Sequence, residues 1–405
     1  MTTKALIIGC GIGGPVAAMA LQRAGIDAAI YEAHAQPADD VGLFLNVATN
    51  GLDALRTLDG HEQVLRDGFP TPRMIMFSGT GKRLGDVPNG GMLADGTTSL
   101  TIRRGLLHRA LRDEAFRRGI RIEPGKRLIG VERRSNAIVA RFEDRTSAEG
   151  DILVGFDGLH SRTREILDRS APRPRYAGML SLGGIARATH VPPTPGAYHM
   201  IFGARAFFGY SVPRSRDVYW FANLPRPVEP TPRELADTPS GAWKRELLEL
   251  FAGDAGPAAA IVEATEDEIG AYPVHDLPAV PRWHDDRMVL AGDAAHATSP
   301  SSGQGASIAI EDALVLAKCL RDVARPKDAF AEYVALRRSR VERIVRYSSS
   351  VGRTKTAGPV ARRVRDLVMP LALKWFASAS AQSWMYSYHI DWNDRIAARP
   401  ASASE

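Results

Sequence analysis

The segment from Gly292 to Ala306 combines an acidic residue with three glycines, and their order suits a polar, negatively charged ligand. The apolar residues 288–291 predict a short strand that leads to Asp293, whose carboxylate can accept hydrogen bonds from a polyol. Gly303 and Gly305 then precede a helical pattern. Glycines let backbone N–H groups approach a ligand closely, and the positive end of a helix favours negative charge. We therefore expect a ligand site at this loop.

A second glycine-rich loop lies near the N-terminus. Residues 4–24 predict a strand, a tight turn and a helix, and a second strand follows and ends at Glu32. Gly9 allows the turn, Gly11 lets the backbone approach a pyrophosphate, and Gly14 lets the helix pack closely on the strand. Glu32 can accept hydrogen bonds from both ribose hydroxyls and would repel a 2′-phosphate. This unit therefore predicts a site for FAD or NAD rather than NADP.

A third strand, at residues 151–156, ends in Asp157-Gly158, and the basic stretch 159–164 follows it. One interpretation is a further ligand contact at the end of a strand. The other is an ordinary strand–turn–helix start with Asp157 as the helix cap, and taken alone this motif favours the cap.

Composition and charge argue against several classes of function. A chain of 405 residues is long enough for two or three domains, and its net charge of +6 comes without a basic block interleaved with aromatics, so we expect no nucleic-acid partner. The two cysteines, Cys10 and Cys319, allow neither a disulfide framework nor a metal site, which is typical of the cytoplasm. The first apolar run is too short for a signal peptide or a membrane span, so we expect a cytoplasmic protein.

The remaining pattern predicts an α/β fold: a Rossmann-like domain, an inserted, mostly antiparallel β-sheet and a helical C-terminus. Prolines, glycines and aromatics concentrate between about residues 171 and 230. The elements expected there and around it are a hairpin at 73–78 and 83–87, a helix at 104–118, strands at 197–202, 206–212 and 217–224, helices at 242–252 and 257–264, and mostly helix after 306.

The three motifs, in this order, resemble the single-component FAD-dependent aromatic hydroxylases of the para-hydroxybenzoate hydroxylase type over roughly residues 1–340. The resemblance implies that Glu32 binds the adenosine ribose and that Asp293 holds the ribityl chain of FAD. It also implies that Asp157 lies near the pyrophosphate, and it matches Arg104 to an FAD-contacting arginine, with Arg103 as the competing candidate. The full set that the resemblance assigns to the cofactor is Gly9, Gly11, Gly13, Gly14, Glu32, Arg104, Leu128, Asp157, Gly158, Gly292, Asp293, Pro300, Gly303, Gln304, Gly305 and Ala306.

The resemblance assigns residues to domains and leaves two departures. The FAD-binding domain comprises residues 1–72, 100–170 and 276–330, the substrate domain 73–99 and 171–275, and a helical segment 331–405. Relatives often carry Pro-Asn where this chain has Thr49-Asn50, and an arginine of some members is absent from residues 42–47. These departures leave open how the flavin moves.

No second G-x-G-x-x-G unit with a matching acid or arginine follows the first. NAD(P)H would then dock transiently as the reductant, and the resemblance implies that O2 reacts with the reduced flavin. The expected function is hydroxylation of an aromatic or polycyclic small molecule through a C4a-hydroperoxyflavin. A flavin epoxidase or a Baeyer–Villiger oxygenase, a flavin halogenase and, in another class, a non-catalytic flavin-binding protein stay open. Residues 220–225 lack the second Trp and the Ile of the halogenase motif.

The substrate should lie against the aromatic strands at residues 197–224. Candidate contacts are His199, Phe208, Tyr210 and Tyr219, although core packing is the stronger interpretation for each aromatic. Phe208 and Tyr210 share one face by strand alternation, but the sequence does not say which face meets the flavin. The sequence identifies no catalytic side chain and no metal cluster. We expect the apolar C-terminal run at 364–388 to pack on the other domains rather than on a membrane.

Overall fold

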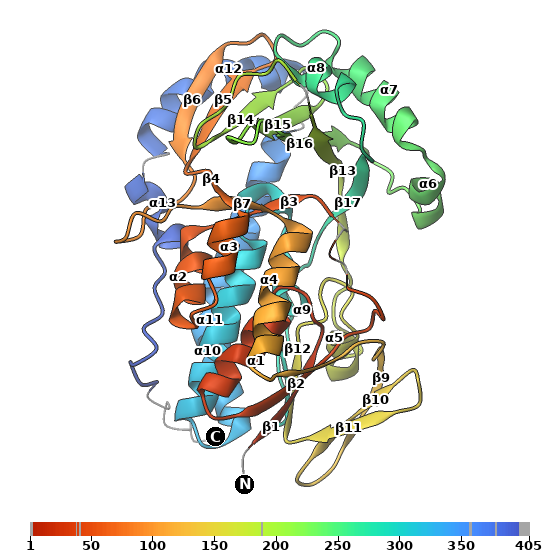
Figure 1. Ribbon diagram of the computed structural model, residues 1–405, viewed down its shortest axis with the longest axis vertical. Helices are drawn as coiled ribbons and strands as arrows, with labels where there is room; N and C mark the ends of the chain where they lie inside the picture. The colour runs from red at the N-terminus through yellow and green to blue at the C-terminus, as the bar shows by residue number, and fades with distance from the viewer. Residues whose placement is uncertain are drawn as a thin grey trace.

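The computed structural model describes residues 3–37, 39, 42–187, 189–355, 359–376 and 379–396. Two sheets dominate it, a five-stranded parallel sheet in the lower half of Figure 1 and a seven-stranded mixed sheet at its top. The α/β class, the separate antiparallel sheet and the helical C-terminus that the sequence predicts are therefore confirmed.

The five-stranded sheet follows the order β18-β12-β1-β2-β8, and every neighbouring pair is parallel. Its strands are β1 (Lys4–Ile8), β2 (Asp27–Tyr31), β8 (Arg121–Glu123), β12 (Ile152–Gly155) and β18 (Met288–Leu290). Strands such as β12 and β18 are buried along their whole length, which explains their continuous apolar runs. Two helices, α1 (Gly13–Arg23) and α10 (Gly305–Asp322), pack against each other beside this sheet.

The seven-stranded sheet follows the order β17-β13-β16-β15-β14-β5-β6, and all its pairs are antiparallel except β14 with β5. Its strands are β5 (Arg73–Ser78), β6 (Arg83–Pro88), β13 (Arg175–Ala186), β14 (Ala197–Phe202), β15 (Phe207–Ser211), β16 (Val218–Pro225) and β17 (Gly270–Asp276). The expected hairpin and the three expected strands are present. The sequence did not indicate β13, because its three glycines weaken the strand pattern.

Two helices, α7 (Ser240–Phe251) and α8 (Ala258–Glu263), cover one face of the seven-stranded sheet. Trp220 and Phe208 stack at 5.6 Å between ring centroids on this face, and Phe251 of α7 closes over Phe208. The opposite face looks toward the rest of the molecule. Along β16 the residues that face the helices are almost fully buried, whereas Tyr219 and Phe221 on the opposite face remain partly accessible.

Smaller elements complete this part of the fold. They are β3 (Phe44–Val47), β4 (Phe69–Pro70) and β7 (Leu100–Arg103) in one sheet, β9 (Leu128–Arg133), β10 (Ile138–Phe142) and β11 (Ser147–Gly150) in another, and the helices α2 (Thr49–Thr57), α3 (Glu62–Asp67), α4 (Arg104–Arg117), α5 (Arg162–Leu167), α6 (Pro232–Asp237), α9 (Asp293–His296) and the 3-10 turn η1 (Pro300–Ser302). In Figure 1 the sheet of β3, β4 and β7 lies between the two large sheets.

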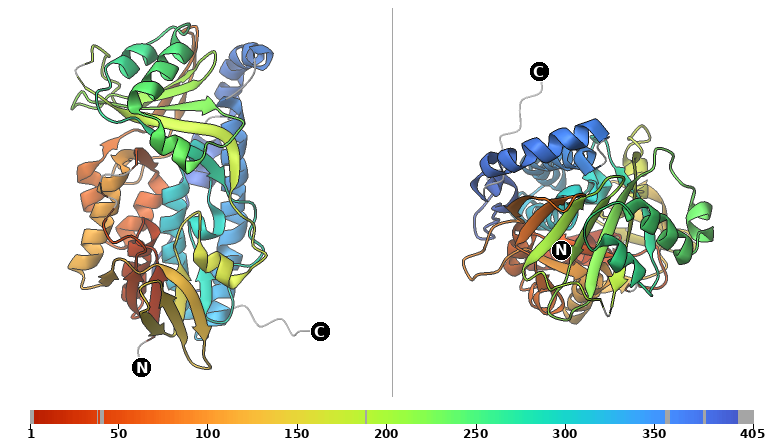
Figure 2. Two further views of the ribbon diagram at one scale, coloured as in Figure 1. Left: turned by 90° about the vertical axis from the view of Figure 1, so that its right-hand side faces the viewer. Right: turned by 90° about the horizontal axis from the view of Figure 1, so that it is seen from above.

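Three helices complete the described chain: α11 (Pro326–Lys355), α12 (Pro359–Phe376) and α13 (Ala379–Tyr386). The blue C-terminal helices extend alongside both large sheets in the left view of Figure 2. On α12, Met369 packs with the cluster around Phe202, while Leu367 and Leu371 are exposed. Part of the apolar C-terminal run therefore packs on the sheet as expected, and residues 377–378 and 397–405 lie outside the described residues. Among the described helices, none combines the length and the apolar character that crossing a membrane requires.

Candidate functional site

The carboxyl ends of the parallel strands bring the three motifs to one edge of the five-stranded sheet. Gly9 follows β1, Glu32 follows β2, Asp157 lies just beyond β12, and Asp293 lies just beyond β18. The Glu32 carboxylate accepts hydrogen bonds from the backbone N–H groups of Cys10 (2.7 Å) and His34 (2.9 Å). Ligands bind at this edge in open α/β sheets.

The four glycines of the first loop differ in what a side chain would meet. A Cβ on Gly14 would stand 2.0 Å from the Gly9 carbonyl oxygen, and one on Gly13 would stand 2.4 Å from the Phe156 ring. Gly9 itself has a φ of +104°, which a side chain rarely tolerates. A Cβ on Gly11 would meet nothing within 4 Å. Three of the glycines are therefore required by packing, and Gly11 borders open space.

The helices α1 and α10 both begin at this edge without a capping side chain. The first N–H groups of a helix have no partner within the helix, and together they favour a negatively charged ligand. Gly303 adopts a left-handed φ of +63° directly before Gln304, the N-cap residue of α10. Within the loop, the N–H of Ser302 donates to the Ser348 hydroxyl, and the N–H of Gly303 donates to the Pro300 carbonyl. The donors that the loop can offer a ligand are therefore those of the first turn of α10.

The Asp293 side chain is accessible to solvent, but protein atoms lie closely around it. The loss of water that they cause raises the pKa of its carboxyl group. The charges of His296 and Arg104 act in the opposite direction and lower it. No hydrogen bond connects the carboxylate to another part of the described chain. A side chain that lines a deep cleft has both properties, because it touches solvent while protein atoms surround it. Asp293 is therefore placed to receive hydrogen bonds from a bound molecule.

The Asp157 carboxylate, in contrast, is used within the protein. It accepts hydrogen bonds from the Ser161 hydroxyl (2.5 Å) and from the backbone N–H (2.8 Å) and hydroxyl (2.9 Å) of Thr163. The N-cap residue of α5 is Ser161, whose hydroxyl accepts a hydrogen bond from the Arg164 backbone N–H, so Asp157 orders the start of the helix from beside the cap rather than as the cap itself. Leu128, which the resemblance assigned to the cofactor, is 5% exposed and belongs to the hydrophobic core.

Several buried polar atoms near this edge have no partner among the described residues: His108 Nε2, Gln304 Nε2 and Asn46 Nδ2. Burial and the nearby Arg104 charge lower the pKa of His108 to about 4, so the imidazole is neutral. Buried polar groups in proteins are normally hydrogen-bonded, so these atoms fit a polar ligand that passes from Glu32 to Gln304. Sequence reasoning missed His108, although its spacing of four residues from Arg104 places both on one helix face.

A buried charge cluster stands directly behind the loop. We define it as Glu311 and Asp312 of α10, Arg337 and Arg340 of α11, and His296. The Asp312 carboxylate pairs with Arg337 at 2.7 Å and with His296 at 2.5 Å, and it also accepts a hydrogen bond from the backbone N–H of Gly292 at 2.9 Å. Glu311 pairs with Arg337 at 2.7 Å and with Arg340 at 2.8 Å.

Electrostatic pairing within the charge cluster outweighs the cost of burial. Burial alone would raise the pKa of Asp312, but the charges of His296 and Arg337 lower it to about 2. Both carboxylates and the Arg337 side chain are inaccessible to solvent. The cluster thereby ties the turn after β18 to two long helices.

The four candidate substrate contacts lie on two different faces of the seven-stranded sheet. Phe208 and Tyr210 point into the core under α7 and α8, and His199 shares that face through a 2.9 Å hydrogen bond between its Nδ1 and the Tyr210 hydroxyl. Phe208 and Tyr210 thus pack in the core under these helices, which is the stronger of the two interpretations of each aromatic from the sequence, whereas His199 is partly accessible. Tyr219 lies on the opposite face, where it contacts Phe44 of β3 at 5.6 Å between ring centroids.

That opposite face includes aromatic residues that sequence reasoning did not select. Phe44 also contacts Phe221 of β16, at 6.0 Å between ring centroids. Asn46, two residues along β3, lies against the loop, because a Cβ on Gly303 would stand 3.4 Å from its Cβ. The aromatic face and the loop before α10 are thus neighbours. Strand alternation groups Tyr219 with Phe221, but only the positions of α7 and α8 identify the free face.

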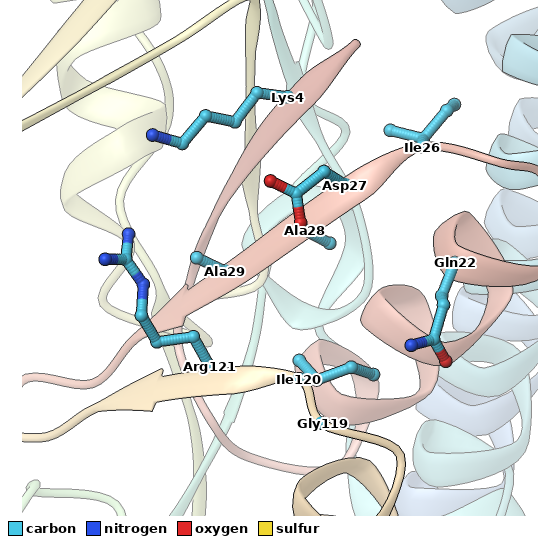
Figure 3. Close-up of a pocket in the computed structure, with 9 residues that line it drawn as sticks. All are labelled: Lys4, Gln22, Ile26, Asp27, Ala28, Ala29, Gly119, Ile120 and Arg121. Atoms are coloured by element: carbon cyan, nitrogen blue, oxygen red, sulfur yellow. The ribbon is translucent and has the colours of Figure 1, made fainter. Parts of the chain in front are cut away.

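Two of the cavities in the described part of the chain differ in their distance from the motifs. One, of about 250 Å³, is lined by Lys4, Gln22, Ile26, Asp27, Ala28, Ala29, Gly119, Ile120 and Arg121. Figure 3 shows Lys4, Asp27 and Arg121 on β1, β2 and β8, at the amino ends of these strands, so this cavity lies away from the motifs. The second, of about 330 Å³, lies between β13, β17, α11 and Ser299, which directly precedes the loop that starts at Pro300.

Comparison with known proteins agrees with this site. Residues 2–348 match the family described as FAD binding domain. The chain is 32% identical over 353 residues to an aurachin C monooxygenase/isomerase of Stigmatella aurantiaca, covering 86% of this chain and 88% of that protein. It is 33% identical over 357 residues to a 6-hydroxynicotinate 3-monooxygenase of Pseudomonas fluorescens, covering 84% and 89%.

Solved structures show the same arrangement. The crystal structure of Klebsiella pneumoniae HpxO complexed with FAD and uric acid superposes with a TM-score of 0.80 at 26% identity, covering 91% of this chain and 93% of that one. The buried polar atoms without partners, the uncapped helices and the open space at Gly11 all suit FAD. The chain therefore belongs to the FAD-dependent aromatic monooxygenase family, and FAD is its cofactor.

Proposed function

We propose that the protein uses NAD(P)H and O2 to insert one oxygen atom into an aromatic small molecule. The observation that carries this proposal is the free aromatic face of the seven-stranded sheet, which adjoins the loop before α10 through Phe44 and Asn46. A bound FAD supplies the redox chemistry: it takes electrons from the nicotinamide and activates oxygen.

The residues at the carboxyl edge would hold this cofactor from end to end. The second lone pairs of the Glu32 oxygens are available to the adenosine ribose, because each oxygen now accepts one backbone N–H. The open space at Gly11 would receive the pyrophosphate. Asp293 would accept hydrogen bonds from the ribityl hydroxyls, with Arg104 close enough to act on its charge. The domain division expected from the sequence forms part of this proposal.

The chain's own contribution to the reaction would be orientation, charge and exclusion of water. The first N–H groups of α10, behind Gly303 and Gln304, would stabilise negative charge that develops beside them. Tyr219 and Phe221 would hold an aromatic ring against this loop and keep water away from it.

The nicotinamide cofactor would bind only transiently. Among the described residues, the five-stranded sheet is the single all-parallel sheet, so a second Rossmann-type unit is not found there. Two-dinucleotide reductases usually carry two such units. This supports a monooxygenase that is reduced, releases NAD(P)⁺ and then meets oxygen.

The experiment is a screen of phenols, hydroxypyridines, quinolones and purines with the FAD-loaded protein. NADH and NADPH oxidation and the mass of each product are measured together. The expected result is stimulated oxidation by at least one compound with a gain of one oxygen atom. A halogenated product that appears only with chloride or bromide would identify a halogenase. FAD binding without any stimulated oxidation would support a non-catalytic flavin protein and contradict the proposal.

A further inference from the structure

We propose that Lys355 binds an anionic group of the substrate, so that the protein selects aromatic compounds that carry a carboxylate or another ionised oxygen. This inference rests on the proposed function and specifies its substrate class. Lys355 is the last residue of α11 and lies beyond residue 348, where the family match ends.

The ammonium group of Lys355 lies on the face of the seven-stranded sheet opposite α7 and α8, beside the cluster in which Phe207 packs with Phe202 and with Met369 of α12. Its Nζ stands 4.7 Å from the centre of the Phe207 ring and 5.7 Å from the centre of the Phe221 ring. It donates a hydrogen bond to the Asn223 side-chain oxygen at 3.2 Å. All three neighbours are uncharged. They come from β15 and β16, whose pairing sets Phe207 directly opposite Asn223.

Lys355 has no carboxylate partner among the described residues, whereas many other basic side chains near the sheets do. Arg365 of α12, for example, also lies over an aromatic ring, that of Phe202, but it pairs with Asp366 at 2.8 Å. An ammonium group has three donors, and one hydrogen bond is identified for Lys355. A cation in such surroundings is costly unless a charge or further acceptors satisfy it.

The Lys355 side chain is crowded by protein atoms and still partly accessible, as the Asp293 side chain is. The Lys355 side chain is only half-buried, yet surrounding protein atoms lower its pKa to about 8 through desolvation. It therefore remains largely protonated near neutral pH. On the same helix, Gly352 and Ser349, about one and two turns earlier, line the 330 Å³ cavity beside Met179.

The position of Lys355 relative to the loop before α10 suits a substrate that spans the free face. Phe221 contacts both Lys355 and Phe44, and Asn46 on the same strand as Phe44 adjoins Gly303. An aromatic ring held along Phe221 would have its anionic group at Lys355 and its other end toward the flavin loop. Gly183 and Gly209 pair with Phe221 on the two neighbouring strands, and neither has a side chain that would stand beside the Phe221 ring.

The test compares matched ligands on the oxidised, FAD-loaded protein without NAD(P)H. Salicylate and 4-hydroxybenzoate are titrated beside salicylamide and 4-hydroxybenzamide, which carry the same rings without the carboxylate charge. Binding is followed by the change in flavin absorption. Because a charge-assisted hydrogen bond is stronger than a neutral one, we expect at least one carboxylate to bind about tenfold or more tightly than its amide.

Two variants remove the charge effect in different ways. Lys355→Met keeps the length of the side chain and should bind the acid and the amide about equally, whereas Lys355→Arg should retain the preference. Asn223→Asp places a carboxylate beside Nζ without a change in size and should also abolish the preference. Lys327→Met, at an exposed lysine paired with Asp286, is the matched control and should behave as wild type.

The proposal is overturned if no carboxylate binds to the wild-type protein, if its amides bind as tightly as its acids, or if Lys355→Met retains the preference. FAD content measured in each variant separates these outcomes from misfolding. The proposed function is judged independently by oxygenated product in the screen described above. Oxygenation of neutral aromatics without any preference for anions would therefore refute the role of Lys355 and leave the monooxygenase assignment intact.

Discussion

The charge cluster behind the loop that precedes α10 differs from two partly accessible charges, Asp293 and Lys355, in how the charges are paired. In the cluster, Glu311 and Asp312 are inaccessible, and each is paired with an arginine. Asp293 and Lys355 are crowded by protein atoms but accessible, and neither has a charged hydrogen-bonded partner in the described chain. Charges that are paired inside the protein fix its structure, whereas charges that are left unpaired beside open space are available to ligands.

The largest effect should follow from breaking the charge cluster. Arg337→Met would leave two inaccessible carboxylates without their shared partner, and such losses cost about 3–5 kcal/mol. We expect this drop in the free energy of unfolding, measured by urea denaturation of the apoprotein. Arg346→Met, at an exposed arginine of the same helix, should change stability by less than about 0.5 kcal/mol. Equal stability of the two variants would show that the cluster is not structural.

Asp293→Asn should have the opposite effect: it should leave the fold stable and weaken the binding of FAD. Hydrogen bonds to a charged group contribute about 1.5–3 kcal/mol, so we expect FAD affinity to fall about tenfold to a hundredfold. Burial raises the pKa of Asp293 in the folded apoprotein. The stability linked to this carboxyl group is therefore present at low pH and is lost as pH rises through the raised value.

At neutral pH the Asp293→Asn apoprotein should accordingly be at least as stable as wild type. Thermal unfolding of the apoproteins from pH 4 to pH 8 checks the sign, and fluorescence titration with FAD checks the affinity. An Asp293→Asn variant that unfolds easily but still binds FAD tightly would show that Asp293 stabilises the fold and does not bind the cofactor.

The glycine loop allows the same distinction between structure and binding to be tested on neutral residues. Gly14→Ala forces a Cβ against the Gly9 carbonyl oxygen and should destabilise the apoprotein by about 1–3 kcal/mol. Gly11→Ala meets no protein atom and should leave apoprotein stability unchanged while it weakens FAD binding. Denaturation and FAD titration of both variants are compared. Similar destabilisation by the two substitutions would argue against open space at Gly11.

The smallest effect concerns the covered face of the seven-stranded sheet. Tyr210→Phe removes the hydroxyl that is hydrogen-bonded to His199 and should cost about 1 kcal/mol of stability. Because helices cover this face, the KM for an aromatic substrate should not change. Tyr219→Leu, on the free face, should raise the KM and leave stability nearly unchanged. A KM that rises for Tyr210→Phe but not for Tyr219→Leu would indicate that the substrate binds on the face under α7 and α8.

The edge that we propose as the flavin site could be predicted because its motifs are local in sequence. Gly9 to Gly14 and the stretch from Asp293 to Ala306 each keep strand, turn and helix within a few residues, and the parallel sheet then unites them at one edge. Asp157 was less certain, since an acid before a helix can cap it or bind a ligand. The structure has Ser161 at the N-cap of α5, and Asp157 accepts hydrogen bonds from Ser161 and Thr163 beside it.

The substrate side could not be predicted in the same way. Strand alternation puts Phe208 and Phe207 on opposite faces, but which face is free depends on α7 and α8, which follow much later in the chain. Lys355 meets Asn223 across more than a hundred residues, and a lone lysine at the end of a helix carries no motif. Sites assembled from distant elements leave little trace in one sequence.

The central claim is that this protein transfers an oxygen atom from O2 to an aromatic substrate. The most direct test is the reaction of the FAD-loaded protein and NAD(P)H with isotopically labelled O2, using the compound that most stimulates NAD(P)H oxidation. The account predicts a product that contains one labelled oxygen atom and an equal amount of oxidised nicotinamide. A product without the label, or oxidised nicotinamide that yields only hydrogen peroxide with every compound tested, would contradict it.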